Sequence, residues 1–146
     1  MILYLETSRL VKLYFEEEGS AETFALVKEA DAAAVSVIAY PEARAAFARK
    51  RIEQRVGDPE YRRLRQDFDR DWERMFVLEA GRRMIREAGD LAEKHGLRGY
   101  DAIHLASALV LRPGGKTVSP AGPVFFCTAD KKLRASAAAE GLTVEV

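Results

Sequence analysis

Four acidic residues stand at comparable positions relative to the apolar segments of the sequence. Glu6 directly follows a short apolar run at the amino terminus, and Asp130 comes three residues after another near the carboxyl terminus. Glu42 and Asp101 each fall in the first turn of a predicted helix. In a parallel sheet, strand carboxyl ends and the helix amino ends that follow them meet at one edge. We therefore expect these four carboxylates to converge.

Converging carboxylates repel one another unless a cation compensates their charge. A cluster of oxygen ligands suits hard ions such as Mg²⁺ or Mn²⁺, whereas two histidines and one cysteine are too few and too scattered for a zinc site. Ions held in this way activate a water molecule, contact a phosphate oxygen and stabilise the leaving oxygen during phosphodiester cleavage. They also reverse the local charge, so that a polyanion can approach the acids. The predicted chemistry is metal-dependent hydrolysis of a phosphodiester.

Three of the acids also have a purely structural interpretation. Helix dipoles favour acids such as Glu42 and Asp101 in a first turn, and Asp130 could cap the helix that follows it. Glu6 is different, because an acid that ends a buried strand is costly unless a cation compensates it.

Several other side chains could support this site. Ser36 and Thr128 carry hydroxyls near strand ends, where they could orient a ligand or simply finish a strand. His104 lies about one turn from Asp101, and a packed, hydrogen-bonded histidine is the better interpretation than a catalytic base. A helix after Glu42 carries basic residues that could bind RNA phosphates, although helix-surface ion pairs explain much of this pattern. The candidates are Arg44, Arg49, Lys50 and Arg51.

Short apolar runs alternate with helical patterns along the chain. The predicted strands cover residues 2–5, 33–37, 76–78, 124–127 and 142–146. The predicted helices cover residues 8–14, 21–30, 41–55, 60–74, 82–95, 100–111 and 131–140, and residues 112–123 form a loop. This alternation predicts an α/β fold, a three-layer α/β/α sandwich with a central, largely parallel sheet. Residues 1–146 are expected to form a single domain.

Composition restricts the classes of function. The 23 basic and 23 acidic residues give no net charge, so attraction to nucleic acid must come from a local basic patch or a metal. A single cysteine indicates a reduced, cytoplasmic setting. The charged residues Glu6, Arg9 and Lys12 interrupt the first apolar stretch, so neither a signal peptide nor a membrane span is expected.

Four segments together resemble the motifs of PIN-domain ribonucleases, in the order of that family and over nearly the whole chain. They are residues 4–14 (YLETSRLVKLY), residues 35–37 (VSV) with Glu42, residues 98–106 (RGYDAIHLA) and residues 126–133 (FCTADKKL). The resemblance implies a ribonuclease that uses Mg²⁺ or Mn²⁺ at Glu6, Glu42, Asp101 and Asp130.

Among small members of that family, the chain looks most like VapC-type toxins. This resemblance implies the toxin of a type II toxin–antitoxin pair, which cleaves structured RNA such as transfer or ribosomal RNA by metal-activated water. It also implies a homodimer and an antitoxin protein as partner.

One position departs from the family pattern. The family usually has aspartate where this chain has Glu6, and catalytic geometry tolerates such a shift poorly. Glu6 could reach the ion through a water, or it could mark a weakened or inactivated enzyme. Arg9, where the family commonly has a small residue, could hold a phosphate, pair with Glu6 or lie solvated at the surface.

Two alternative functions therefore stay open. The first is a catalytically weakened PIN module that binds RNA or an antitoxin without cutting, and Glu6 is the feature that supports it. The second is a receiver-like phosphoacceptor, although the sequence lacks the paired acids and the late lysine which that site needs.

Overall fold

Five short strands form one parallel sheet in the computed structural model, which describes residues 1–113 and 122–145. The sheet order is β3-β2-β1-β4-β5, and every neighbouring pair is parallel. The strands are β1 (Ile2–Leu5), β2 (Ala32–Ser36), β3 (Phe76–Leu78), β4 (Val124–Cys127) and β5 (Thr143–Val144). The helices are α1 (Thr7–Leu10), the 3₁₀ turn η1 (Val11–Leu13), α2 (Ser20–Glu29), α3 (Ala39–Glu53), α4 (Asp58–Trp72), α5 (Arg82–His95), α6 (Gly99–Val110) and α7 (Lys131–Ala139).

The central strand β1 is apolar throughout because it is covered on both faces. All four of its side chains are fully buried. Alternate residues point to opposite faces of a strand, so Ile2 and Tyr4 belong to one core and Leu3 and Leu5 to the other.

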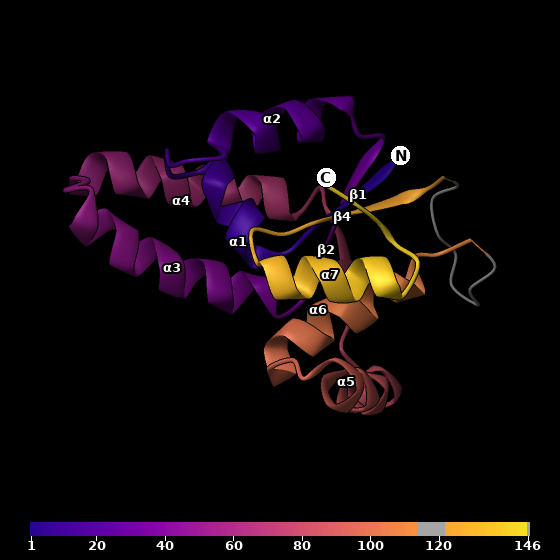
Figure 1. Ribbon diagram of the computed structural model, residues 1–146. Coiled ribbons are helices and arrows are strands. Elements are labelled where there is room, and N and C mark those ends of the chain that lie inside the picture. The colour runs from indigo at the N-terminus through magenta and orange to yellow at the C-terminus, as the bar shows by residue number, and fades with distance from the viewer. Residues whose placement is uncertain (114–121, 146) are drawn as a thin grey trace.

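Each core is closed by its own layer of helices (Figure 1). Apolar residues of α1, η1, α3 and α4 pack against Leu3 and Leu5, with α2 at the edge of that layer. Residues of α6 and α7 pack against Ile2 and Tyr4, and α5 packs mainly on α6. The predicted three-layer α/β/α sandwich with a parallel sheet is confirmed.

The order of the strands places the two acid-bearing strand ends next to each other. The chain builds the sheet outward from β1 through β2 to β3, and then returns to the other side of β1 for β4 and β5. Leu5 pairs with Cys127, so the segments that follow β1 and β4 emerge side by side. This is the switch point at which ligands bind in such sheets.

The receiver-like alternative is wrong on this topology. A receiver-like sheet has the strand order 2-1-3-4-5, in which the first strand lies between the second and the third. Here β1 lies between β2 and β4.

Most predicted boundaries differ from the structure by one or two residues, and three differences have physical causes. The first helix begins at Thr7, where a start at residue 8 was predicted, because the Glu6 side chain caps it by accepting the N–H of Ser8. It is α-helical only to Leu10 and continues as the 3₁₀ turn η1. The last strand is limited to Thr143–Val144, because only two of its residues pair with β4.

The predicted loop 112–123 falls mostly outside the described residues. Within residues 1–113 and 122–145, no helix is both long and apolar enough to cross a membrane.

Candidate active site

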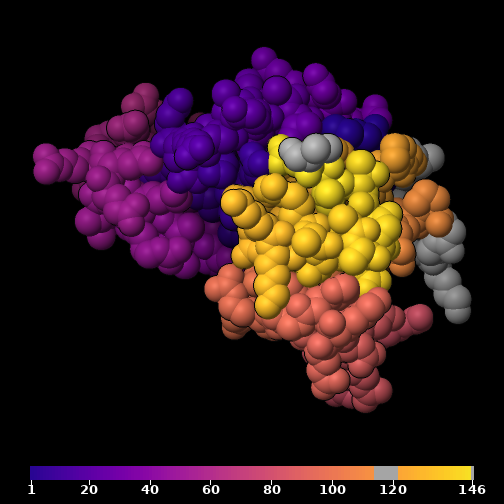
Figure 2. Space-filling model, viewed as in Figure 1, coloured from indigo at the N-terminus to yellow at the C-terminus, as the bar shows by residue number. Residues whose placement is uncertain are grey.

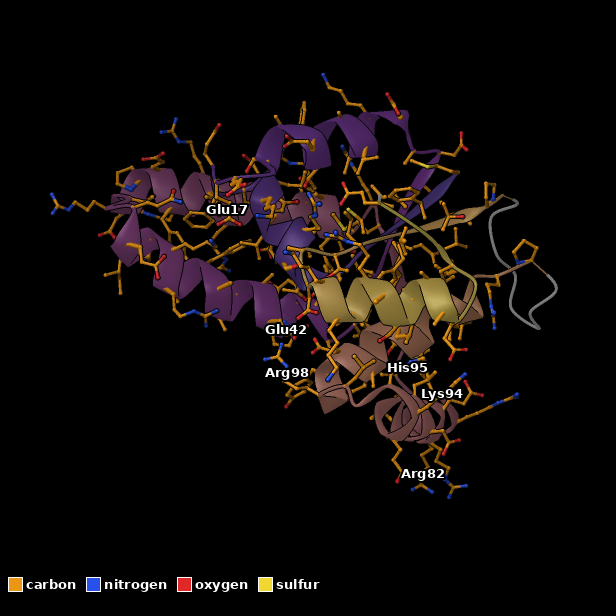
Figure 3. All side chains as sticks on the ribbon, in the orientation of Figure 1. Glu17, Glu42, Arg82, Lys94, His95 and Arg98 are labelled. Carbon is orange, nitrogen blue, oxygen red and sulfur yellow. The ribbon has the colours of Figure 1, made fainter. Side chains whose placement is uncertain are left out.

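A cleft of about 580 Å³ opens where β1 and β4 end. Three of the four predicted acids line it, namely Glu6, Glu42 and Asp101, which come from segments far apart in the sequence. Figure 3 shows Glu42 and Arg98 close together at the amino ends of α3 and α6. The carboxylates of these three residues therefore share one cleft.

Glu6 is held by donors from both strand ends. Its carboxylate accepts a hydrogen bond from the backbone N–H of Ser8 at 3.2 Å and another from the Ser8 hydroxyl. The Thr128 hydroxyl, which follows β4, donates to Glu6 Oε2 at 2.8 Å. The Ser8 hydroxyl in turn accepts the N–H of Ala129 at 2.9 Å. Only 7% of Glu6 is exposed, so this network fixes the buried carboxylate and ties the two segments together.

Glu42 ends a buried chain of polar side chains. The Tyr4 hydroxyl lies 2.8 Å from His104 Nδ1, and His104 Nε2 lies 2.7 Å from Glu42 Oε1. The Thr7 hydroxyl donates to the same Glu42 oxygen at 2.7 Å. Burial alone would raise the pKa of Glu42, but the contacts with His104 and Thr7 outweigh it and leave the pKa lowered. Glu42 is therefore held as an oriented carboxylate, and His104 is the packed, hydrogen-bonded histidine that was predicted.

Asp101 faces a cation from its own helix. Arg98, the N-cap residue of α6, donates from Nε to Asp101 Oδ2 at 3.0 Å. This hydrogen bond raises the pKa of Arg98, with smaller contributions from Asp130 and Glu6, and Arg98 also lowers the pKa of Glu42. One guanidinium thus experiences the field of all four predicted acids.

Asp130 does not line the cleft, and its structural interpretation is borne out. It caps α7, because its Oδ1 accepts the N–H of Leu133 at 2.8 Å. Its own N–H donates to the Thr128 hydroxyl at 3.1 Å, the same hydroxyl that holds Glu6. The Thr128 hydroxyl therefore connects the backbone of Asp130 with the carboxylate of Glu6, so Asp130 lies next to the other acids.

The donor set fits a hard divalent ion, but the acids are tied to protein groups. Carboxylate oxygens from separate segments are the ligands that Mg²⁺ and Mn²⁺ take. Within the described ranges, however, no three His, Cys, Asp or Glu side chains are close enough to form a metal site. Glu6 and Glu42 accept hydrogen bonds from protein groups, and Asp101 pairs with Arg98. Binding of a metal ion by these carboxylates would replace those hydrogen bonds and that ion pair.

Sequence comparison identifies the family to which this site belongs. The model of the PIN domain matches residues 3–138. The chain is 35% identical over 143 residues to ribonuclease VapC45 of Mycobacterium tuberculosis, covering 98% of this chain and 94% of that protein. The chain belongs to the PIN-domain family. The predicted likeness to VapC-type members is confirmed by the same match.

Solved structures agree on the fold. FitAcB from Neisseria gonorrhoeae superposes with a TM-score of 0.64 at 15% identity, covering 100% of this chain and 97% of that one. VapBC2 from Rickettsia felis, crystallised with a DNA fragment from its promoter, gives 0.61 at 14% identity and covers 99% and 98%.

The basic side of this PIN-domain cleft differs in part from the sequence prediction. Arg49 and Lys50 line the cleft as expected, together with Lys12, which was not predicted. Arg44 and Arg51 do not line it. Arg44 donates to the Tyr40 hydroxyl at 3.1 Å, and Arg51 pairs with Asp58 and lies 4.1 Å from the centre of the Tyr61 ring.

Glu17 is the acid on this basic side. It pairs with Lys12 at 3.1 Å and with Lys50. Burial would raise the pKa of Glu17, but the two ammonium groups together leave it lowered. Both lysines are therefore held at the cleft by one carboxylate.

Two of the predicted supporting residues lie away from the cleft. Ser36 is fully buried, and its hydroxyl accepts the N–H of Ile38 at 3.4 Å, which is a local turn contact. Arg9 is only 9% exposed, donates to Thr23 at 3.1 Å and pairs with Glu145. Of the three alternatives for Arg9, the solvated surface position and the pair with Glu6 are wrong, because Arg9 is buried and pairs with Glu145.

The residues missed by sequence reasoning are Lys12, Arg98, Thr7 and Tyr4. Arg98 carried a usable signal, because it stands three residues before Asp101 and a helix brings such a pair together. Tyr4 carried none, since its hydroxyl reaches His104 across 100 positions of sequence.

Proposed function

We propose that this chain is a divalent-cation-dependent ribonuclease and the toxin of a toxin–antitoxin pair. The observation that carries the proposal is that Glu6, Glu42 and Asp101 line one cleft together with Lys12, Arg49 and Lys50. A cleft lined by acidic and basic side chains suits a polyanionic substrate. The basic side chains would bind its phosphates, and the acids would hold a cation beside the bond that is cut. The 35% identity to a protein named as a ribonuclease supports the same activity.

Different residues of the chain would hold the metal ion, orient its ligands and bind the substrate. Glu6, Glu42, Asp101 and Asp130 would hold Mg²⁺ or Mn²⁺, which when bound supplies counter-charge and Lewis acidity toward water and phosphate. The buried His104 keeps Glu42 oriented, and Thr128 does the same for Glu6. Lys12, Arg49 and Lys50 would bind the phosphates of the RNA strand on the other side of the cleft.

Cleavage of transfer RNA by the purified protein tests this function. We expect cleavage with Mg²⁺ or Mn²⁺, loss of it on chelation, and loss of it in Asp101→Asn, which keeps the size of the side chain. Arg82→Gln is the matched control because Arg82 is exposed on α5, away from Glu42 (Figure 3). Cleavage that survives in Asp101→Asn would refute the assignment of the site.

The alternative of a PIN module that binds without cutting has one observation in its favour. The Glu6 carboxylate already accepts hydrogen bonds from Ser8 and Thr128, which leaves it less available to an ion. Expressing the given chain beside Glu6→Asp separates the two functions. Growth arrest by Glu6→Asp alone would support the weakened module, and arrest by both chains would support the ribonuclease.

The partners are also proposals. The likeness to VapBC2 supports an antitoxin protein as partner, and the family resemblance supports a homodimer. Structured RNA as substrate and a cytoplasmic setting stay predictions. Co-expression with the product of a neighbouring gene, followed by size-exclusion chromatography, tests both partners.

A further inference from the structure

A second hollow of about 320 Å³ lies next to the candidate active site. Its lining comprises Arg9, Lys12, Glu18, Gly19, Ala129 and Arg134. Lys12 and Ala129 also line the acidic cleft, so the two hollows meet at these residues. Figure 2 shows the segments that form this boundary, the indigo amino-terminal region and the yellow-orange α7, next to each other on one face.

Three cations and one acid, Glu18, line this hollow, so basic side chains outnumber the acid in its lining. Arg9 is already neutralised by Glu145, and Lys12 by Glu17. Within residues 1–113 and 122–145, Arg134 has no acidic partner. The charge of Arg134 is therefore the one a bound anion would compensate.

Arg134 is held in position without using its full hydrogen-bonding capacity. Its Nη2 donates to the carbonyl oxygen of Thr128 at 3.1 Å, while its Nε is buried with no hydrogen-bond partner in the described part of the chain. Within residues 1–113 and 122–145, Nη1 of Arg134 donates no hydrogen bond, so this donor is left for a ligand, and the planar fork of a guanidinium matches phosphate oxygens.

Gly19 keeps space beside two cations of this hollow. Gly19 has a φ of 86°, a left-handed conformation that favours glycine. A Cβ atom at this position would lie 3.2 Å from Arg9 Nη1 and 3.5 Å from Lys12 Cδ. A larger residue at position 19 would therefore crowd these two cations, which line the hollow together with Arg134.

We propose that this hollow is a subsite for a non-scissile phosphate of the RNA substrate, bound between Lys12 and Arg134. The inference rests on the proposed ribonuclease function. RNA carries one phosphate per nucleotide, so a strand with its scissile phosphate in the acidic cleft continues past Ala129 into this hollow. Arg134 is then a residue that fixes the path of the substrate, and it takes no part in the chemical step.

The salt dependence of RNA binding tests the subsite. Each phosphate contact to a single strand contributes about 0.7 to the slope of log K against log salt concentration. Binding of a labelled single-stranded RNA is measured by fluorescence anisotropy in the Asp101→Asn background, which is expected not to cut. Adding Arg134→Gln should lower the slope by about 0.7. The affinity deficit of that variant should then shrink about threefold when the salt concentration rises fivefold.

Two variants separate a phosphate contact from a structural role. Arg134→Lys keeps the charge and should retain the slope of the parent chain. Arg82→Gln removes an exposed charge from α5, far from Glu42 in Figure 3, and should leave the slope unchanged. Thermal unfolding of each variant verifies that the fold is intact.

The outcomes are distinguishable. An unchanged slope in Arg134→Gln, even with weaker binding, would overturn the subsite and would assign Arg134 to support of Thr128. If the unmodified chain neither binds nor cuts RNA, the proposed function fails and the subsite fails with it. Cleavage by the unmodified chain together with an unchanged slope in Arg134→Gln would refute the subsite and leave the proposed ribonuclease function standing.

Discussion

Replacing His104 by phenylalanine tests the buried chain that positions Glu42. The change keeps a flat ring in a fully buried position and removes both ring nitrogens. The Tyr4 hydroxyl loses its contact with Nδ1, and Glu42 loses its contact with Nε2. We expect loss of stability and a freer Glu42 side chain.

The magnitude follows from the burial of the two groups. A buried hydroxyl left without its partner costs about 1 to 3 kcal/mol. Burial raises the pKa of Tyr4, and a contact with Ser107 partly offsets this. Ser107 can therefore replace part of the lost hydrogen bond, which favours the lower half of that range. The Glu42 side chain is 32% exposed, so water limits its loss to about 1 kcal/mol. The expected destabilisation is about 2 kcal/mol.

A double-mutant cycle with Tyr4→Phe isolates the contact. Removing both partners of a buried hydrogen bond costs less stability than leaving one partner unpaired. The free energy of unfolding of the double variant should therefore be about 1 kcal/mol higher than the sum of the single changes predicts. Urea unfolding followed through Trp72 measures this, because Trp72 is the single tryptophan and packs on Tyr40 and Phe68, away from His104. Additive single changes, or a stable His104→Phe protein, would refute the proposed chain of contacts.

Two further predictions concern the charges of the cleft. Arg98→Gln removes the cation that pairs with Asp101. Because an exposed ion pair is weak, Mn²⁺ affinity measured by calorimetry should rise by up to about fivefold. An unchanged or lower affinity would contradict this role. Glu17→Gln removes an acid whose pKa is lowered on folding. In the parent chain, this acid should add to the free energy of unfolding above the ordinary glutamate pKa, and the contribution should disappear as the pH falls. The variant should lack this pH-dependent contribution when urea unfolding is measured across the acidic range. The same variant frees Lys12 and Lys50 and should bind RNA more tightly, and equal RNA binding by both chains would count against a phosphate-binding role for the lysines.

The sheet could be predicted from the sequence because its signals are local. The run 2–5 is apolar at every position, which is typical of a strand covered on both faces, and the structure buries all four of its residues. The adjacency of β1 and β4 could not be read from the sequence, since pairing between residues 5 and 127 depends on the path of the intervening chain. This adjacency is what brings Glu6 and Thr128 together.

The acids were found because they stand at element ends, whereas their partners could not be found. Arg9 looked like a surface residue beside the site, but a contact with Glu145, 136 positions away, holds it in the interior. Arg98 and Lys12 were overlooked because single cations are common in a chain with 23 basic residues. Sequence spacing locates carboxylates at the edge of a sheet, but the counter-charges come from tertiary structure.

The glutamate at position 6, where the family usually has aspartate, makes contacts that depend on the length of its side chain. Glutamate is not among the preferred N-cap residues, yet Glu6 caps α1 through the N–H of Ser8. Its additional methylene, about 1.5 Å of reach, also lets the carboxylate accept from Thr128 on the neighbouring strand end. The network thus links the segments after β1 and β4 at the point where the cleft opens. Aspartate at this position, the residue that the family usually has, would give up part of that link and shorten the reach of the carboxylate. Stability and activity should therefore move in opposite directions in Glu6→Asp.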